Sequence, residues 1–131
     1  MISERHVAAM VDHARSEFPN EACGLLASNN GAIVRFYPIR NAEASPVTYR
    51  MEPQDQLKAM LEIDDQDWQL AAIFHSHTRT RAYPSKTDVS LAFYPDSLYV
   101  IVSLADDAAP EVRAYRILDG MISEVVLERV A

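Results

Sequence analysis

One segment, "SLYVIVSL" at residues 97–104, constrains the fold more than any other. A half-exposed strand alternates apolar and polar residues, whereas a continuous apolar run is typical of a strand that is covered on both faces. Such a strand needs helices on either side of its sheet. Because the predicted elements follow the order α-β-β-α-β-α-β-β-β, the sequence predicts an α/β fold with helices packed on a mixed sheet.

Helical periodicity marks residues 4–18 and 53–65, and a shorter helix is predicted at 86–93. The first helix follows Ser3, a suitable N-cap, and ends before Pro19, which cannot make a helical hydrogen bond. The second helix begins at a proline, which suits the first helical position. Its inward face is predicted to contain Leu57, Met60 and Leu61.

Strands are predicted between and after these helices. Two pairs of strands are expected to form hairpins, because the turn signals "NNG" and "DG" separate apolar segments. The predicted strands are residues 24–28, 32–39, 68–77, 97–104, 111–118 and 123–130.

The composition fits one domain that spans residues 1–131, because 49% of the residues are apolar and can form a single core. The N-terminal residues lack the apolar run of a signal peptide, and no apolar run has the length of a membrane span. We therefore expect a cytoplasmic protein without a membrane partner. A net charge of −7 and a pI near 4.9 argue against nucleic acid as a partner.

The segment "HSHTRTRAYPSKTD" contains a candidate metal site. If residues 68–77 form a strand, His75 and His77 point to the same side and Ser76 points to the other. Two imidazoles on one side can bind zinc, and Asp88 at the start of the next helix can supply a third ligand. A catalytic zinc site keeps its fourth position open to water.

The same residues also have explanations without a metal. A histidine pair at this spacing is often an exposed polar pair or is satisfied by hydrogen bonds. Ser85, followed three residues later by Asp88, has the spacing of a capping box. The two interpretations are compatible, because a helix N-terminus can orient Asp88 toward a site.

The complete pattern resembles the JAMM/MPN+ family of zinc metalloproteases: H-x-H, seven residues, Ser, two residues, Asp. Glu21, in "PNEACGLL", matches the upstream glutamate of that family. The resemblance covers nearly the whole chain and implies an MPN fold, a curved mixed sheet flanked by helices. It also implies one Zn²⁺ per chain, held by His75, His77 and Asp88. In this family the glutamate acts as catalytic base, and the serine, here Ser85, donates a hydrogen bond to the oxyanion.

Several segments, among them "FHSHT", "AYPSKTD" and "YRILDG", resemble short bacterial members of the family. Those members hydrolyse the amide bond between the C-terminus of a ubiquitin-like sulfur-carrier protein and cysteine, which implies this carrier as the partner and free cysteine as a product. Two alternatives are an isopeptidase of the desampylase type, which removes a ubiquitin-like modifier from lysine, and processing of a carrier tail. An alternative of another class is a non-catalytic MPN scaffold.

Other features keep more than one interpretation. Residues 41–49 resemble the family region that lines a groove for an extended tail, but an edge strand without a partner fits equally, and exposed sheet edges are compatible with a homodimer. We expect Cys23 to be a buried thiol rather than a fourth ligand. One of Arg79, Arg81 and Lys86 is hypothesised to meet a substrate carboxylate, with solvated loop charges as the alternative.

Overall fold

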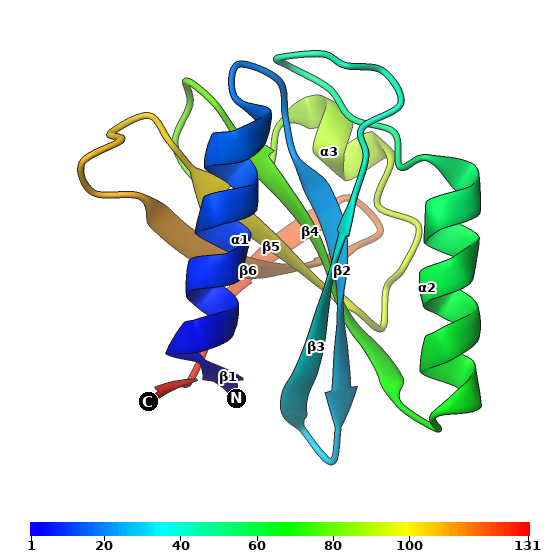
Figure 1. The fold of residues 1–131 in the computed structure, drawn as a ribbon. Helices are drawn as coiled ribbons and strands as arrows, with labels where there is room; N and C mark the ends of the chain where they lie inside the picture. The colour runs from blue at the N-terminus through cyan, green and yellow to red at the C-terminus, as the bar shows by residue number, and fades with distance from the viewer.

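A mixed sheet forms the centre of the structure, a computed structural model that describes residues 1–131 (Figure 1). Its strands are β2 (Cys23–Asn29), β3 (Ala32–Ile39), β4 (Gln69–His77), β5 (Leu98–Ser103), β6 (Glu111–Leu118) and β7 (Met121–Val125). They lie in the order β3-β2-β4-β5-β6-β7. The β4–β5 pair is parallel and the other pairs are antiparallel, so the predicted mixed sheet is confirmed.

The two long helices, α1 (Glu4–Glu17) and α2 (Pro53–Asp65), pack on opposite faces of the sheet (Figure 1). Successive residues of a strand point to opposite faces, so each central strand contributes to both cores. The core under α1 contains Met10, Leu26, Phe74 and Val100, and the core under α2 contains Leu25, Ala59, Ile63, Ile73 and Ile101. The apolar run at residues 97–104 thus forms a strand that is buried on both faces, as predicted.

Both predicted hairpins are present, and their turns explain the residues found there. Asn30 and Gly31 have φ values of 52° and 82°, and Asp119 and Gly120 have values of 51° and 77°. Two consecutive residues with positive φ are the requirement of a type I′ turn, which matches the twist of the strands that it connects.

Two element boundaries differ from the prediction. The segment predicted as one strand at 123–130 divides into β7 and β8 (Arg129–Val130), because β8 pairs with β1 (Ile2–Ser3) in a separate parallel pair next to the N-terminus (Figure 1). The third helix, α3 (Lys86–Ser90), is shorter than predicted. Beyond it the chain turns back, and the Tyr94 amide donates to the Tyr99 hydroxyl at 3.0 Å.

The inward face predicted for α2 is wrong at two of its three residues. Leu57 and Leu61 are 58% and 59% exposed, Met60 is half-buried, and Ala59 and Ile63 face the core. The helix offers two apolar stripes, and the sheet packs against the one that contains Ile63. Neither α2 nor any other helix has the length and apolar character needed to cross a membrane.

The pairing of β2 with β4 determines where polar residues meet. Cys23 lies opposite His75, so the start of β2 lies beside the end of β4. The segment before β2 is therefore brought to the last residues of β4, although more than fifty residues separate them in the sequence.

Candidate active site

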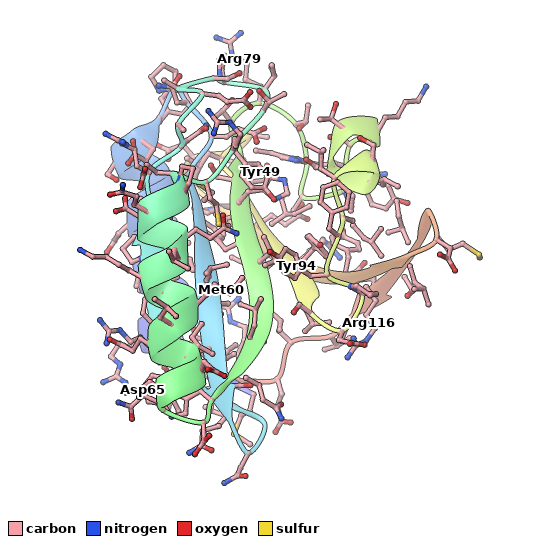
Figure 2. The ribbon with its side chains drawn as sticks, turned by 90° about the vertical axis from the view of Figure 1, so that its right-hand side faces the viewer. Tyr49, Met60, Asp65, Arg79, Tyr94 and Arg116 are labelled. Carbon is pink, nitrogen blue, oxygen red and sulfur yellow. The ribbon has the colours of Figure 1, made fainter.

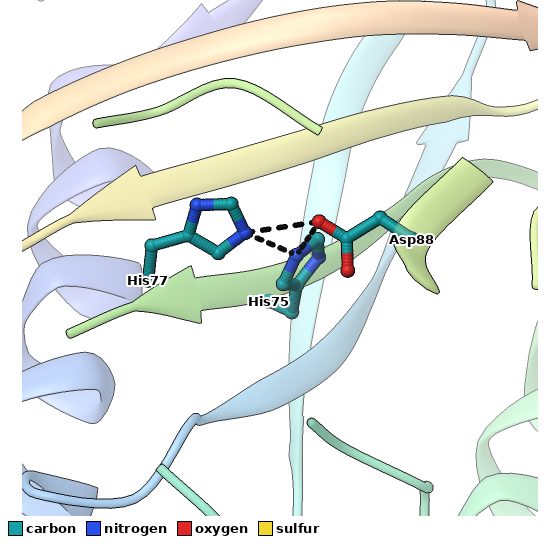
Figure 3. Close-up of side chains that lie close together, drawn as sticks. All are labelled: His75, His77 and Asp88. Atoms are coloured by element: carbon teal, nitrogen blue, oxygen red, sulfur yellow. Dashed lines mark hydrogen bonds and ion pairs between the residues drawn. The ribbon is translucent and has the colours of Figure 1, made fainter. Parts of the chain in front are cut away.

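Three side chains converge at the end of β4 (Figure 3). His75 and His77, on the α2 side of the strand, are 1% and 3% exposed. Asp88 reaches them from the first turn of α3, with its Oδ2 atom 3.1 Å from His75 Nε2 and 2.9 Å from His77 Nε2. The two Nε2 atoms are themselves 3.1 Å apart. The predicted grouping of these three residues is thus present in the structure.

The hydrogen bonds of His77 indicate which of its ring nitrogens carries a proton. His77 Nδ1 lies 2.9 Å from the carbonyl oxygen of Arg81, which can only accept, so Nδ1 carries a proton. In a neutral ring, the Nε2 atom of His77 then presents a lone pair to the Asp88 carboxylate. Two acceptors in contact repel each other unless a cation or a proton lies between them. Although burial would lower the pKa of His77, the hydrogen bonds to Asp88 and Arg81 outweigh burial and raise that pKa, so without a metal a proton on Nε2 can bridge to Asp88. A metal cation in the same position would satisfy all three acceptor atoms at once.

The spacing of the three atoms suits zinc. Ligand atoms about 2.0–2.1 Å from a tetrahedral ion lie roughly 3.3 Å from one another, close to the distances of 2.9–3.1 Å found between the three atoms. Burial lowers the pKa of His75, which favours the neutral imidazole that a metal requires. Although burial would raise the pKa of Asp88, His75 and His77 hold that pKa well below its usual range when, in the absence of a metal, they donate protons to it.

Ser85 and Asp88 form the capping box that their spacing predicts. The Ser85 hydroxyl oxygen accepts from the Asp88 amide at 3.1 Å, and Asp88 Oδ2 accepts from the Ser85 amide at 2.9 Å. Capping therefore fixes the carboxylate that points at the histidines. It leaves the hydroxyl proton of Ser85 free to donate elsewhere.

Glu21 lies beside this group and is almost completely buried, with 4% of its surface exposed. Its Oε1 atom has no hydrogen-bond partner. Burial raises the pKa of Glu21 to about 8, the nearby His77 opposes this increase, and Asp88 adds to it. A buried carboxyl group without a partner is costly to the fold, and such groups occur at functional sites.

The backbone around Glu21 is held by contacts that the sequence analysis missed. The Glu21 amide donates to the Ser45 carbonyl at 2.8 Å, and Asn41 Nδ2 donates to the Glu21 carbonyl at 3.0 Å. The Ser76 hydroxyl accepts from the next amide, that of Ala22, at 2.7 Å. The only sequence signal for Ser76 was that it points away from the two histidines.

Tyr49, labelled in Figure 2, is another residue whose contact with the metal site the sequence did not indicate. Its ring stacks on His75, with the centroids 4.7 Å apart and the planes 21° apart. This contact restrains the imidazole of a residue whose Nδ1 has no hydrogen-bond partner. Cys23, in contrast, is fully buried and donates to the Ile39 carbonyl at 3.4 Å, so the predicted buried thiol is confirmed.

A cleft of about 270 Å³ opens over these groups. Glu21, His77 and Ser85 all line it, so a substrate in the cleft would meet the buried carboxyl group, one imidazole and one hydroxyl together. The remaining lining residues are Pro46, Val47, Thr78, Arg79 and Thr80.

Comparisons with known proteins agree with this geometry. Residues 3–118 match the family described as prokaryotic homologs of the JAB domain. A CysO-cysteine peptidase from Mycobacterium tuberculosis is 49% identical over 120 residues, which cover 90% of this chain and 82% of the relative. A desampylase from Haloferax volcanii is 29% identical over 102 residues, covering 72% and 73%.

Solved structures show the same architecture. The solution structure of a protein from Desulfitobacterium hafniense is 35% identical, with a TM-score of 0.88, over 99% of this chain and 93% of the other. A JAB1/MPN domain protein from Archaeoglobus fulgidus has a TM-score of 0.68 at 21% identity, over 99% and 98%. The predicted MPN fold is thus confirmed. The chain belongs to the prokaryotic JAB family, and it is a zinc-dependent hydrolase of the JAMM type.

Proposed function

We propose that this protein hydrolyses the amide bond between the C-terminus of a ubiquitin-like sulfur-carrier protein and cysteine. In this proposal His75, His77 and Asp88 hold the zinc ion, Glu21 transfers protons and Ser85 donates a hydrogen bond. The reaction consumes one water molecule: the amide C–N bond breaks, the carrier regains a C-terminal carboxylate, and cysteine leaves with a free amino group.

The main support for the proposal is that Glu21, His77 and Ser85 line one cleft. Three acceptor atoms converge beside a buried carboxyl group that has no hydrogen-bond partner, and a hydroxyl with a free proton lines the same cleft. Together these groups meet the needs of amide hydrolysis: a metal, a proton acceptor and an oxyanion donor. The relative that is 49% identical supports cysteine as the leaving group.

A bound zinc ion would supply Lewis-acid chemistry, polarising the carbonyl and acidifying water in its open position. The Glu21 carboxylate would accept a proton from the attacking water and return it to the departing nitrogen. Its position in the cleft and its lack of a partner leave it free for both transfers. The Ser85 hydroxyl would donate to the oxygen that gains negative charge as the carbonyl carbon becomes tetrahedral.

The test is incubation of the zinc-loaded protein with a carrier–cysteine adduct, followed by intact-mass measurement of the carrier. We expect conversion of the adduct to free carrier. Glu21→Gln keeps the size of the side chain but cannot accept a proton, so it should lower kcat by about 10²–10⁴-fold while zinc content stays unchanged. An unchanged carrier mass with the zinc-loaded wild type would contradict the proposal.

A second candidate is an isopeptidase that removes a ubiquitin-like modifier from lysine. The desampylase of Haloferax volcanii supports it, since that relative is 29% identical over most of both chains. The proposed zinc ligands would serve either reaction, so the leaving group decides between them. Cleavage of a carrier–lysine isopeptide faster than carrier–cysteine would favour the isopeptidase.

A further inference from the structure

The three basic residues between β4 and the first turn of α3 have different surroundings. Arg79 lines the catalytic cleft together with Glu21, and it lies at the top of the molecule in Figure 2. The Arg81 guanidinium instead stacks over the Tyr83 ring, 4.9 Å from its centroid. Lys86, the first residue of α3, is exposed and is absent from the lining of the cleft. Among these three cations, only Arg79 can meet a substrate in the cleft.

The charge of Arg79 is also uncompensated. A second cleft of about 470 Å³ adjoins the first, and Arg79 and Thr78 line both. The other cation of this second cleft, Arg15, already donates to the Asp107 carboxylate at 3.2 Å and to the Asp107 carbonyl at 2.8 Å. Arg79 has neither an ion pair nor a side-chain hydrogen bond. An anionic group that enters either cleft can therefore form an ion pair with Arg79.

We propose that Arg79 binds the α-carboxylate of the departing amino acid, an inference that rests on the proposed function. The carboxylate of an amino acid lies two bonds from its nitrogen. Glu21 would deliver a proton to that nitrogen, so the cation that binds the carboxylate must line the same cleft as Glu21. Arg79 is the basic residue that does so. Its planar guanidinium can bind a carboxylate through two parallel hydrogen bonds.

This contact defines the substrate class. A carrier joined to a single amino acid presents a carboxylate next to the scissile amide, whereas a carrier joined to a lysine side chain has none near the ε-nitrogen. Arg79 would therefore favour conjugates that end in a free amino acid over isopeptides. It would also hold the leaving amine in position to receive the proton from Glu21.

The test compares two substrates that differ in one group: the carrier–cysteine adduct and the same adduct with an amidated cysteine. For the wild type we expect kcat/KM to be about 10- to 100-fold higher for the acid, the range of a hydrogen bond to a charged group. Arg79→Gln should lower kcat/KM for the acid by the same factor and leave the amide unchanged. Arg79→Lys keeps the charge but loses the paired hydrogen-bond geometry. Its kcat/KM for the acid should lie between the values of the wild type and of Arg79→Gln.

Lys86→Gln is the matched control, since it removes an exposed cation of the same region outside the cleft, and it should leave both rates unchanged. Equal rates for acid and amide would overturn the inference, as would a preference for the acid that survives in Arg79→Gln. Both results leave the proposed function intact. If the zinc-loaded wild type cleaves neither substrate, the proposed function itself fails, and the role of Arg79 fails with it.

Discussion

The two halves of the proposed active site are built in different ways. The metal half consists of His75, His77, Ser85 and Asp88, whose directions come from strand alternation and from a capping box. The base half consists of Glu21 and the residues that hold its backbone, Asn41 and Ser45. Their contacts join parts of the chain that lie 20 and 24 residues from Glu21 in the sequence. Local geometry thus fixes one half, and long-range hydrogen bonds fix the other.

This difference predicts which property a substitution in each half should change. In the metal half, a change at any of the three side chains that we propose as ligands should remove zinc. In the base half, the side chain that we propose to transfer protons makes no hydrogen bond, and its position depends on its backbone. Changes in the base half should alter the rate or the stability and leave the zinc in place.

The largest effect is expected from Asp88→Asn. The asparagine oxygen can still accept from the Ser85 amide, so the helix start should survive, but the negative charge of the proposed ligand is lost. We expect zinc to be lost and activity to fall by at least about 10³-fold, beyond the roughly 10- to 100-fold typical of residues that only support a ligand. Zinc content per chain and kcat measure this. Asp96→Asn, a change at an exposed acid, is the control, and full zinc content in Asp88→Asn would refute its assignment.

Ser85→Ala tests whether this residue does more than cap α3. Loss of one oxyanion donor typically lowers kcat by roughly 10²–10³-fold. Loss of the cap alone lowers the free energy of unfolding by about 1 kcal/mol. We expect both effects with zinc retained, measured by kcat, thermal unfolding and metal content. A variant that is less stable but keeps wild-type kcat would leave Ser85 with the capping role only.

The sequence predicted the metal half better than the base half, for a physical reason. The spacing of His75 and His77 and the capping box follow from strand and helix geometry, which short segments reveal. Glu21 was identified only through the family pattern, because its approach to His77 depends on how β2 pairs with β4. The roles of Asn41 and Tyr49 depend on tertiary contacts. The same holds for α2, where Ile63 rather than Leu61 is buried against the sheet.

The base half should also show in the pH dependence of stability. Burial raises the pKa of Glu21 from 4.5 to about 8 in the folded protein. Below about pH 4.5 the carboxyl group is protonated in both the folded and the unfolded state, so its ionisation does not lower the free energy of unfolding. As the pH rises through 4.5 to 8, the unfolded chain loses this proton first, so the folded state loses stability, and above pH 8 the full loss is present.

Glu21→Gln cannot ionise, so in zinc-free protein it should gain stability over the wild type as the pH rises. We expect no gain near pH 4.5 and a gain on the order of 2–4 kcal/mol near pH 9, measured by denaturant unfolding in the presence of a chelator. A bound zinc ion would stabilise the ionised form of Glu21. The stability gained by Glu21→Gln should therefore be smaller in zinc-loaded protein. A difference between the two proteins that is the same at both pH values would show that Glu21 does not titrate in this range.

The smallest effect is expected from Asn41→Ala, which acts on Glu21 only through its backbone. Asn41 donates to the Glu21 and Thr48 carbonyls and accepts from the Glu43 and Arg50 amides, so its loss leaves four backbone groups without their partner. We expect kcat to fall about tenfold with zinc retained, because a displaced base transfers protons less well. Asn29→Ala, at an exposed site, is the control. In a Glu21→Gln background, Asn41→Ala should lower kcat no further, because the group it positions can no longer accept a proton. An equal loss in both backgrounds would mean that Asn41 supports the fold rather than the position of Glu21.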